Sequence, residues 1–126
     1  MNIELGLAID LGSVVDGYTG NWNSHLNNSE SNRDIYNWMF EHGAEYGFIL
    51  RYPKGEEMST GIYPESWHYR YIGKEAALDY IEEAKKYKKW DSSAKVNYYA
   101  YTYEKYHQET YGTAVYDGKP FYFINE

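Results

Sequence analysis

Aromatic side chains are the feature that most restricts how this chain can fold. They make up 20% of the 126 residues, and 17 of them are Tyr. Aromatic residues are favoured in strands, where their rings pack on a pleated surface, so the composition favours strands and stacking clefts over a helical bundle. Most of these rings are expected in the core, and the others are candidates for a carbohydrate or peptide cleft.

Length, charge and cysteine content exclude several classes of protein. The chain is long enough for one domain of ordinary size. Twelve basic and 19 acidic residues give a formal net charge of -7, which repels phosphate backbones and argues against nucleic-acid binding. The absence of cysteine excludes thiol catalysis, disulfides and Cys-type zinc sites, and leaves His, Asp and Glu as metal ligands.

Membrane insertion and export are not indicated by the sequence. The longest apolar runs are only a handful of residues, whereas a bilayer span needs about 20. The first residues lack the basic and apolar regions of a signal peptide, so the pattern assigns no localisation.

The first half of the sequence predicts two strands and a helix. Residues 5–10 alternate bulky and small side chains, which predicts a strand that presents Asp10 on an otherwise bare face. After a serine cap, residues 31–46 carry apolar side chains at helical spacing, and Gly47 is expected to end this helix. Residues 48–52 predict a buried strand.

The following segment continues this mixed pattern. Residues 68–72 predict another strand, and residues 77–90 carry apolar side chains at helical spacing. Lysines near the end of the second helix would complement its dipole. The pattern to this point predicts an α+β fold.

The tail, residues 91–126, has a different texture. Residues 96–103 alternate and are rich in Tyr, which predicts a strand, and residues 113–116 and 121–124 flank turn residues that predict a hairpin. We expect a tyrosine-rich β tail packed on a partial domain formed by residues 1–90. Its first strand would either cover an apolar face or pair as an edge with another strand.

One short motif carries candidate chemistry. In Glu65-Ser66-Trp67-His68 a carboxylate stands three residues before an imidazole. A His nitrogen and an Asp oxygen, such as that of Asp10, can hold zinc, while a Glu outside the coordination sphere takes a proton from water. Alone, the same spacing is also typical of a surface salt link or of a core histidine between aromatic neighbours.

Four segments together resemble the VanY-like D-alanyl-D-alanine carboxypeptidases in order and spacing. They are G-L-A-I-D at 6–10, Y-G-F-I-L-R-Y-P at 46–53, T-G-I at 60–62 and E-S-W-H-Y-R-Y-I-G at 65–73. The resemblance covers about residues 3–85. It implies an α+β fold of the D-Ala-D-Ala peptidase and Hedgehog type, and a zinc hydrolase that trims stem peptides of bacterial peptidoglycan, outside the membrane or at the cell surface.

The resemblance also implies roles for individual residues. Asp10 and His68 look like the zinc ligands, and Glu65 looks like the general base. The substrate-binding residues that it implies are Trp67, Tyr69 and Arg70. Trp67 would form a wall of the site and Arg70 would pack or pair behind it. A simpler role for Arg70, and for Arg51, is to balance nearby acids.

Two family features have no counterpart in the sequence. The family's first metal-binding stretch reads S-x-H-x-x-G-x-A-x-D, and alignment on Asp10 places Met1 at the serine and Ile3 at the histidine. The family's upstream S-x-Y-R-type arginine is also missing. We therefore expect an N-terminally truncated fold with impaired activity and weakened zinc binding, because catalytic zinc normally has three protein ligands. The other candidates for a third ligand are Glu4, His25, His42 and His107.

Two further expectations concern partners. A truncated fold would expose apolar faces, which the tail, a second copy of the chain or a missing N-terminal polypeptide would have to cover. The alternative to an enzyme is a noncatalytic module that binds a cell-wall peptide or a protein in an aromatic cleft. That cleft would consist of Trp22, Trp67, Tyr69 and Tyr71.

Overall fold

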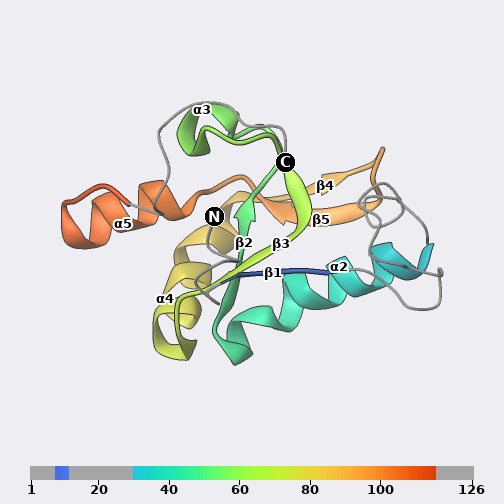
Figure 1. The fold of residues 1–126 in the computed structure, drawn as a ribbon, viewed down its shortest axis with the longest axis horizontal. Coiled ribbons are helices and arrows are strands. Elements are labelled where there is room, and N and C mark those ends of the chain that lie inside the picture. The colour runs from blue at the N-terminus through green and yellow to red at the C-terminus, as the bar shows by residue number, and fades with distance from the viewer. Residues whose placement is uncertain (1–7, 12–29, 116–126) are drawn as a thin grey trace.

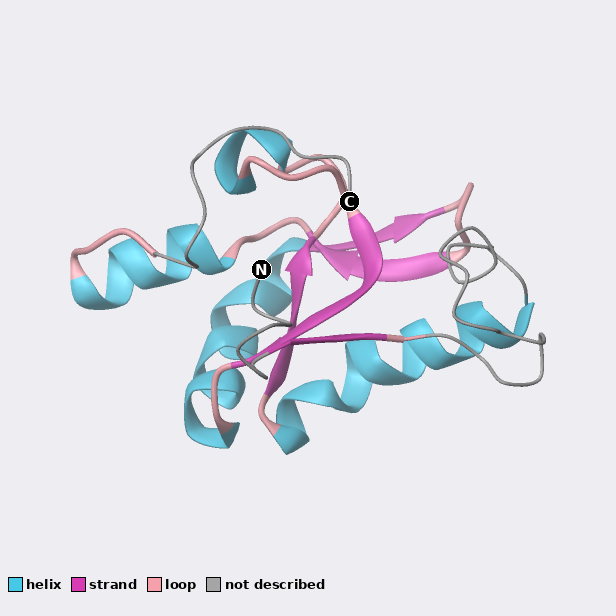
Figure 2. Ribbon diagram, in the orientation of Figure 1, coloured by secondary structure: helices cyan, strands magenta, loops and turns pink. Residues whose placement is uncertain are grey.

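A three-stranded antiparallel sheet forms the centre of the fold (Figure 2). The structure is a computed structural model, and it describes residues 8–11 and 30–115. In the sheet, β3 (Glu65–Tyr71) lies between β1 (Ala8–Asp10) and β2 (Phe48–Tyr52). All three strands were predicted, and β3 begins three residues earlier than expected. The sheet therefore places β1, from the start of the family-like region, next to β3, from its later part.

The first predicted helix is confirmed, together with its stop. Helix α2 (Glu30–His42) continues into the 3-10 helix η3 (Gly43–Tyr46) and ends at Gly47. Gly47 has φ +91°, and a Cβ there would lie 2.5 Å from the Tyr71 ring. Only glycine combines this left-handed backbone with such a close approach, so the turn into β2 depends on it.

The second predicted helix is shorter than the sequence pattern indicated. Helix α4 (Lys74–Ala84) passes through the 3-10 helix η4 (Lys85–Tyr87) and ends there, so its predicted extension to residue 90 is wrong. Lys88–Asp91 instead form strand β4, which pairs with β5 (Val96–Tyr99). The apolar spacing continued past Tyr87, but a hairpin turn closed by Asp91 overrides it, because the Asp91 carboxylate accepts two backbone N–H groups.

The prediction of a β-rich tail is correct for the hairpin and wrong for the segment that follows it. Strand β5 ends at Tyr99, and residues Tyr103–Tyr111 form helix α5. Thr102 begins this helix, and its hydroxyl oxygen accepts the backbone N–H of Lys105. This N-cap outweighs the strand-like alternation of tyrosines. The predicted hairpin at residues 113–116 and 121–124 lies largely outside the described residues.

The short helix α3 (Glu57–Thr60) was not predicted, because four residues give too little periodicity to recognise. It follows β2 and contacts α5 at one end of the sheet (Figure 1). Thus α5, from the tail, packs beside a segment that belongs to the family-like region.

Tyrosines dominate the core, as the composition predicted. Helix α4 packs on β2, and the tail contributes two of the rings that fill this contact. Each fully buried ring contributes about 1.5–3 kcal/mol through the apolar area removed from water. The main cluster consists of Ala44, Ile49, Ala77, Tyr80, Ala84, Tyr101 and Tyr106. The described part of the tail thus shares a core with α4, and a boundary between residues 90 and 91 stays a prediction.

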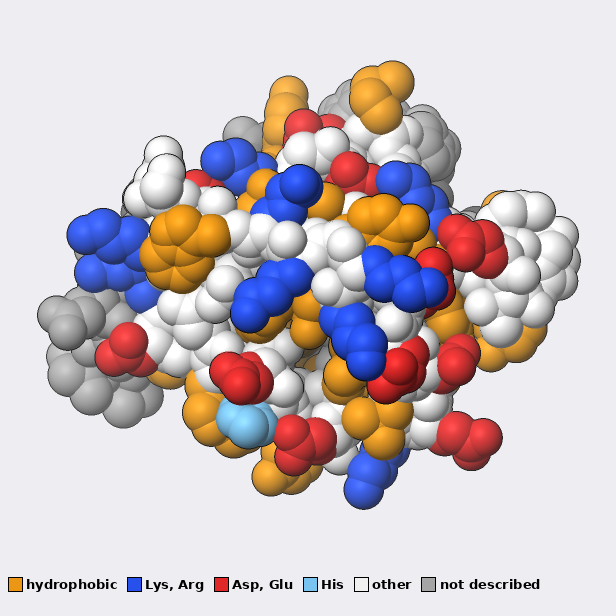
Figure 3. Space-filling model, turned by 180° about the vertical axis from the view of Figure 1, so that it is seen from behind, with side chains coloured by type: hydrophobic (Ala, Val, Ile, Leu, Met, Phe, Trp, Pro, Cys, Tyr) orange, Lys and Arg blue, Asp and Glu red, His pale blue; other side chains and the backbone are white. Residues whose placement is uncertain are grey.

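The surface carries mixed charge. Figure 3 shows basic side chains interspersed with acidic ones on the face opposite to that of Figure 1. Within the lysine run after α4, Lys85 pairs with Glu82 at 3.0 Å and Lys86 pairs with Glu83 at 2.9 Å. No helix among the described residues has the length and apolar character to cross a membrane.

Candidate metal centre

Asp10 and His68 meet across two neighbouring strands. The antiparallel register places Asp10 of β1 directly opposite His68 of β3. The Asp10 Oδ1 and His68 Nδ1 atoms are 2.8 Å apart, and the imidazole is fully buried. The expected convergence of these two side chains, 58 positions apart in sequence, is therefore present in the structure.

Glu65 joins this pair because β3 is irregular. Residues three apart in a regular strand lie on opposite faces, which would separate Glu65 from His68. The register between β2 and β3 shifts between Leu50 and Tyr52, so that Tyr52 pairs with Glu65. Such an irregularity re-aims side chains. The Glu65 Oε1 atom consequently lies 3.4 Å from His68 Nδ1.

The three residues form a compact donor group. One potential ligand atom from each of Asp10, Glu65 and His68 lies within 4.8 Å of the others. Glu65 and His68 are buried and Asp10 is mostly buried. Two carboxylates and an imidazole are oxygen and nitrogen donors that suit zinc.

The local hydrogen bonding supports a cation at this position. Asp10 Oδ1 and both ring nitrogens of His68 are buried, and none has an aligned hydrogen-bond partner among the described residues. The short Oδ1–Nδ1 approach therefore brings two polar atoms together without the geometry of a hydrogen bond. Buried polar atoms of this kind are costly unless something satisfies them. An ion shared by the two atoms would do so, and the donor set fits zinc.

An aromatic ring supports the imidazole. The rings of Tyr52 and His68 lie 4.9 Å apart between centroids, and both side chains are buried. The Arg51 guanidinium lies over the other ring of this pair, 5.0 Å from the centroid of Tyr52. Tyr52 was not predicted to belong to the site, although its place in the R-Y-P segment of β2 was a usable signal.

The three predicted substrate-binding residues are placed differently. Trp67 is half-buried, and its carbonyl oxygen accepts the Leu11 N–H at 2.9 Å. Arg70 is also half-buried, donates to the Tyr71 carbonyl oxygen and lies over the Tyr103 ring. Both residues flank the donor group on β3, and their contact with substrate stays a prediction.

Tyr69 is not brought to the metal centre. Its side chain is 2% exposed, and it packs in the core beside Gly43. Burial raises the pKa of its phenol, with a smaller contribution from Tyr99. A ring enclosed in this way cannot contact a substrate, so the prediction for Tyr69 needs correction. Alternation along β3 explains this, because the neighbour of His68 lies on the opposite face.

The predicted aromatic cleft is likewise not formed by its described members. Tyr69 is in the core, whereas Tyr71 is exposed and packs edge-on against Phe48 at 5.4 Å. Trp22 lies outside the described residues. The described aromatic residues of that set therefore do not line one common surface.

The two described residues among the remaining candidate ligands, His42 and His107, do not join the donor group. His42 ends α2, where its ring nitrogen lies 2.9 Å from a carboxylate oxygen of Glu45. His107 lies on α5, where its ring nitrogen is 2.8 Å from the Thr113 carbonyl oxygen. The other residues considered, Met1, Ile3, Glu4 and His25, lie outside the described residues.

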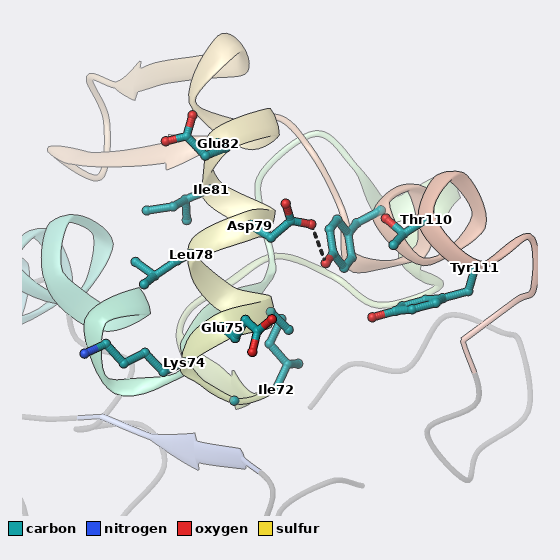
Figure 4. Close-up of a pocket in the computed structure, with 12 residues that line it drawn as sticks. Ile72, Lys74, Glu75, Leu78, Asp79, Ile81, Glu82, Thr110 and Tyr111 are labelled. Carbon is teal, nitrogen blue, oxygen red and sulfur yellow. Dashed lines mark hydrogen bonds between the residues drawn. The ribbon is translucent and has the colours of Figure 1, made fainter.

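A surface pocket among the described residues lies away from the donor group. It has a volume of about 920 Å³ and opens between α4 and α5, where Asp79 accepts the Tyr106 hydroxyl at 2.9 Å (Figure 4). None of the three donor residues lines it. The chemistry of the site is thus defined by its donor atoms and not by this pocket.

The fold and the donor group are those of an α+β protein with a candidate metal site, and known proteins identify its family. The family model described as VanY, D-alanyl-D-alanine carboxypeptidase, matches residues 4–74. This match covers more than half of the chain. The chain therefore belongs to the VanY family of D-alanyl-D-alanine carboxypeptidases.

Individual relatives agree with this assignment. A D-alanyl-D-alanine carboxypeptidase of Enterococcus faecalis is 39% identical over 74 residues, which are 59% of this chain and 23% of the relative. The solved structure of VanYB in complex with D-alanine-D-alanine is 32% identical, with a TM-score of 0.52 over 66% of this chain and 39% of that one.

A second solved structure contains a metal. It is a mutant of the vancomycin resistance D,D-pentapeptidase VanY, from a VanB-type cassette, in complex with Zn(II). It is 33% identical, with a TM-score of 0.51 over 65% of this chain and 39% of that one. The expected α+β peptidase fold is thus confirmed, and the chain spans well under half the length of these relatives.

Proposed function

We propose that this chain carries the metal centre of a zinc-dependent carboxypeptidase that hydrolyses D-Ala-terminated stem peptides of peptidoglycan. The observation that carries the proposal is the buried group of Asp10, Glu65 and His68, whose donor atoms lie within 4.8 Å of one another. Family membership supports the reaction class. The Zn(II) complex of a relative supports the choice of metal.

Each residue of the group has a separate role in this proposal. Asp10 and His68 would hold zinc, and their Oδ1 and Nδ1 atoms lie 2.8 Å apart. When bound, zinc supplies Lewis-acid polarisation of the scissile carbonyl. Glu65 accepts a proton from the attacking water at a carboxylate oxygen and then donates it to the leaving amine. Burial of Glu65 keeps this transfer in a site with little competing water.

The relatives support the proposed substrate class. VanYB was solved with D-alanine-D-alanine, so a peptide with this terminus is the first substrate to test. Such peptides belong to the cell wall, and we propose that the reaction takes place outside the cytoplasmic membrane or at the cell surface. The resemblance aligns Ile3 with the family's first histidine ligand, and on that basis we also propose that zinc binding and turnover are weaker than in a site with three recognised ligands.

A noncatalytic role is the second candidate, and the same substitution at Ile3 favours it. A site that lacks one recognised ligand can retain a metal or a peptide without catalysing hydrolysis. In that case the scaffold binds a cell-wall peptide or a protein. A second copy of the chain or an additional N-terminal polypeptide would then be a natural partner.

Zinc titration tests the metal site directly. We expect stoichiometric binding by the wild type and its loss in His68→Ala. His42→Ala is the matched control, because His42 is an exposed histidine on α2 outside the donor group, and this variant should bind like the wild type. Absence of binding at micromolar zinc, or equal loss in both variants, would refute the proposed site.

Release of D-alanine from a stem pentapeptide separates the two candidate functions. We expect slow, zinc-dependent release that disappears in Glu65→Gln, while Glu45→Gln, a change in an exposed carboxylate, leaves it unchanged. Zinc binding without D-alanine release would favour the noncatalytic module. Release that survives in Glu65→Gln would contradict the assignment of the base.

A further inference from the structure

Helix α5 contributes a carboxylate that pairs with Arg51 of β2, although the helix lies beyond the family-matched residues 4–74. Glu104, in its first turn, accepts both arms of the Arg51 guanidinium, at 2.9 Å and 2.6 Å. The side chain of Arg51 is 3% exposed and that of Glu104 is 23% exposed. This is a mostly buried, two-pronged ion pair, the geometry that gives the strongest orientation.

A continuous set of contacts leads from this pair to the metal ligand. The Arg51 guanidinium lies over the Tyr52 ring, and the Tyr52 ring packs on the His68 imidazole. Tyr52 and His68 are both buried. Because protein interiors are close-packed, a ring in such a position can rotate only if its neighbours move. Arg51 therefore limits the movement of Tyr52, which in turn limits that of His68.

The charges of the Arg51–Glu104 pair also affect the binding of a metal ion. The two ring contacts place the Arg51 cation at most about 10 Å from the His68 ring, close to one Debye length in 0.1 M salt. A buried cation at this range repels a divalent metal, and screening is weak in the interior. Glu104 cancels this repulsion as well as orienting the guanidinium.

Contacts at the start of α5 fix the position of the Glu104 carboxylate. Thr102 caps the helix, and its hydroxyl also lies 2.8 Å from that of Ser59. Lys105 pairs with Glu56 at 2.7 Å on the exposed side. The start of α5 is thus fixed on both sides of Glu104, which leaves its carboxylate aimed at the guanidinium.

We propose that Glu104 is a positioning residue for the metal centre, which acts through Arg51 and Tyr52 on the metal ligand His68. The proposal rests on the proposed function in taking the bound ion to be zinc. It assigns a part of the site to a segment outside the family match, and it implies that α5 is required for full metal affinity.

Zinc affinity of folded variants tests this proposal. Glu104→Gln should weaken zinc binding by up to about 10-fold, because loss of a direct partner of a metal ligand costs about 10-fold to 100-fold and Glu104 acts only through Arg51 and Tyr52. Glu104→Asp should recover part of the loss. Glu56→Gln is the matched control, since it also removes an ion pair of α5, that with Lys105, and leaves the Glu104 carboxylate in place. Gly47→Ala controls for lower stability alone. Both controls should bind zinc like the wild type.

Affinity is measured by competition with a chelator, at a temperature where circular dichroism shows every variant folded. Equal affinity of Glu104→Gln and Glu56→Gln would overturn the proposal. If the wild type itself binds no zinc, the proposed function fails. NMR of the histidine rings in metal-free protein then tests whether Glu104 positions the His68 ring. The His68 ring signal should then shift or broaden in Glu104→Gln and not in Glu56→Gln, and an unchanged signal would refute positioning.

Discussion

Removing either partner of the pair between Arg51 and Glu104 should destabilise the fold, but by different amounts. Glu104→Gln leaves a guanidinium that is only 3% exposed without its counter-charge, which costs about 3–5 kcal/mol of unfolding free energy. Arg51→Met leaves a carboxylate that is 23% exposed. Water and the positive end of α5 can stabilise this carboxylate, so we expect a smaller loss of about 1–3 kcal/mol.

The double variant Arg51→Met/Glu104→Leu provides the decisive comparison. Because it removes both charges and keeps apolar volume, its stability should return close to that of the wild type. Urea unfolding measures all three proteins. With a slope of about 1–3 kcal/mol per molar urea, the loss in Glu104→Gln corresponds to a fall of about 2 M in the midpoint.

Two results would refute this reasoning. If Arg51→Met were the less stable single variant, the difference in burial would not control the cost. If the double variant were as unstable as Glu104→Gln, the pair would contribute net stability that apolar packing cannot replace. Either result would also require a different account of how α5 is held against β2.

Three further predictions concern the surrounding structure. Gly47→Ala should lower the unfolding free energy by about 2–4 kcal/mol in thermal unfolding, from the left-handed backbone and the Tyr71 contact; an unchanged midpoint would contradict it. Thr102→Val should cost about 1 kcal/mol through loss of the α5 cap, whereas Thr102→Ser should not. Burial alone would raise the pKa of Asp91, but two backbone N–H groups and Lys54 outweigh it and lower that pKa. The stabilisation from Asp91 is therefore complete above about pH 4 and is lost as pH falls through the lowered pKa, so acid unfolding should be less steep in Asp91→Asn.

The sequence predicted those parts of the fold that depend on local patterns. Residues 48–52 and the helix that stops at Gly47 were predicted correctly, because alternation, periodicity and a glycine stop are local signals. The Asp10, Glu65 and His68 group was inferred mainly from the resemblance to a family. The separate strands predicted that Asp10 and His68 could meet, but not the irregularity in β3 that admits Glu65.

Other features depended on contacts between distant residues. The apolar spacing that suggested a helix to residue 90 continued into β4, where pairing with β5 prevails. Glu104 was not singled out, because its role depends on Arg51, which is 53 positions away. The Thr102 cap was the local signal for α5, but alternation of tyrosines on either side obscured it. Burial of Tyr69 likewise depends on which face of β3 the core covers.

Metal binding and the docking of β1 should be thermodynamically coupled. Strand β1 is three residues long, and it places the Asp10 carboxylate next to the Glu65–His68 pair. Two neighbouring carboxylates repel each other, and a cation shared with His68 removes that repulsion only while β1 is docked. At zinc 100-fold above its dissociation constant, the bound state gains about 2.7 kcal/mol.

Amide hydrogen exchange can measure this coupling at Leu11, whose N–H donates to the Trp67 carbonyl at 2.9 Å. If local opening of β1 releases the metal, exchange of this amide should slow about 100-fold at that zinc concentration. The Asn97 amide, which donates to Asn37 on the β5 side of the fold, should exchange at the same rate with and without zinc. Equal slowing at both amides would indicate general stabilisation, and no slowing at Leu11 would show that β1 does not contribute to the metal site.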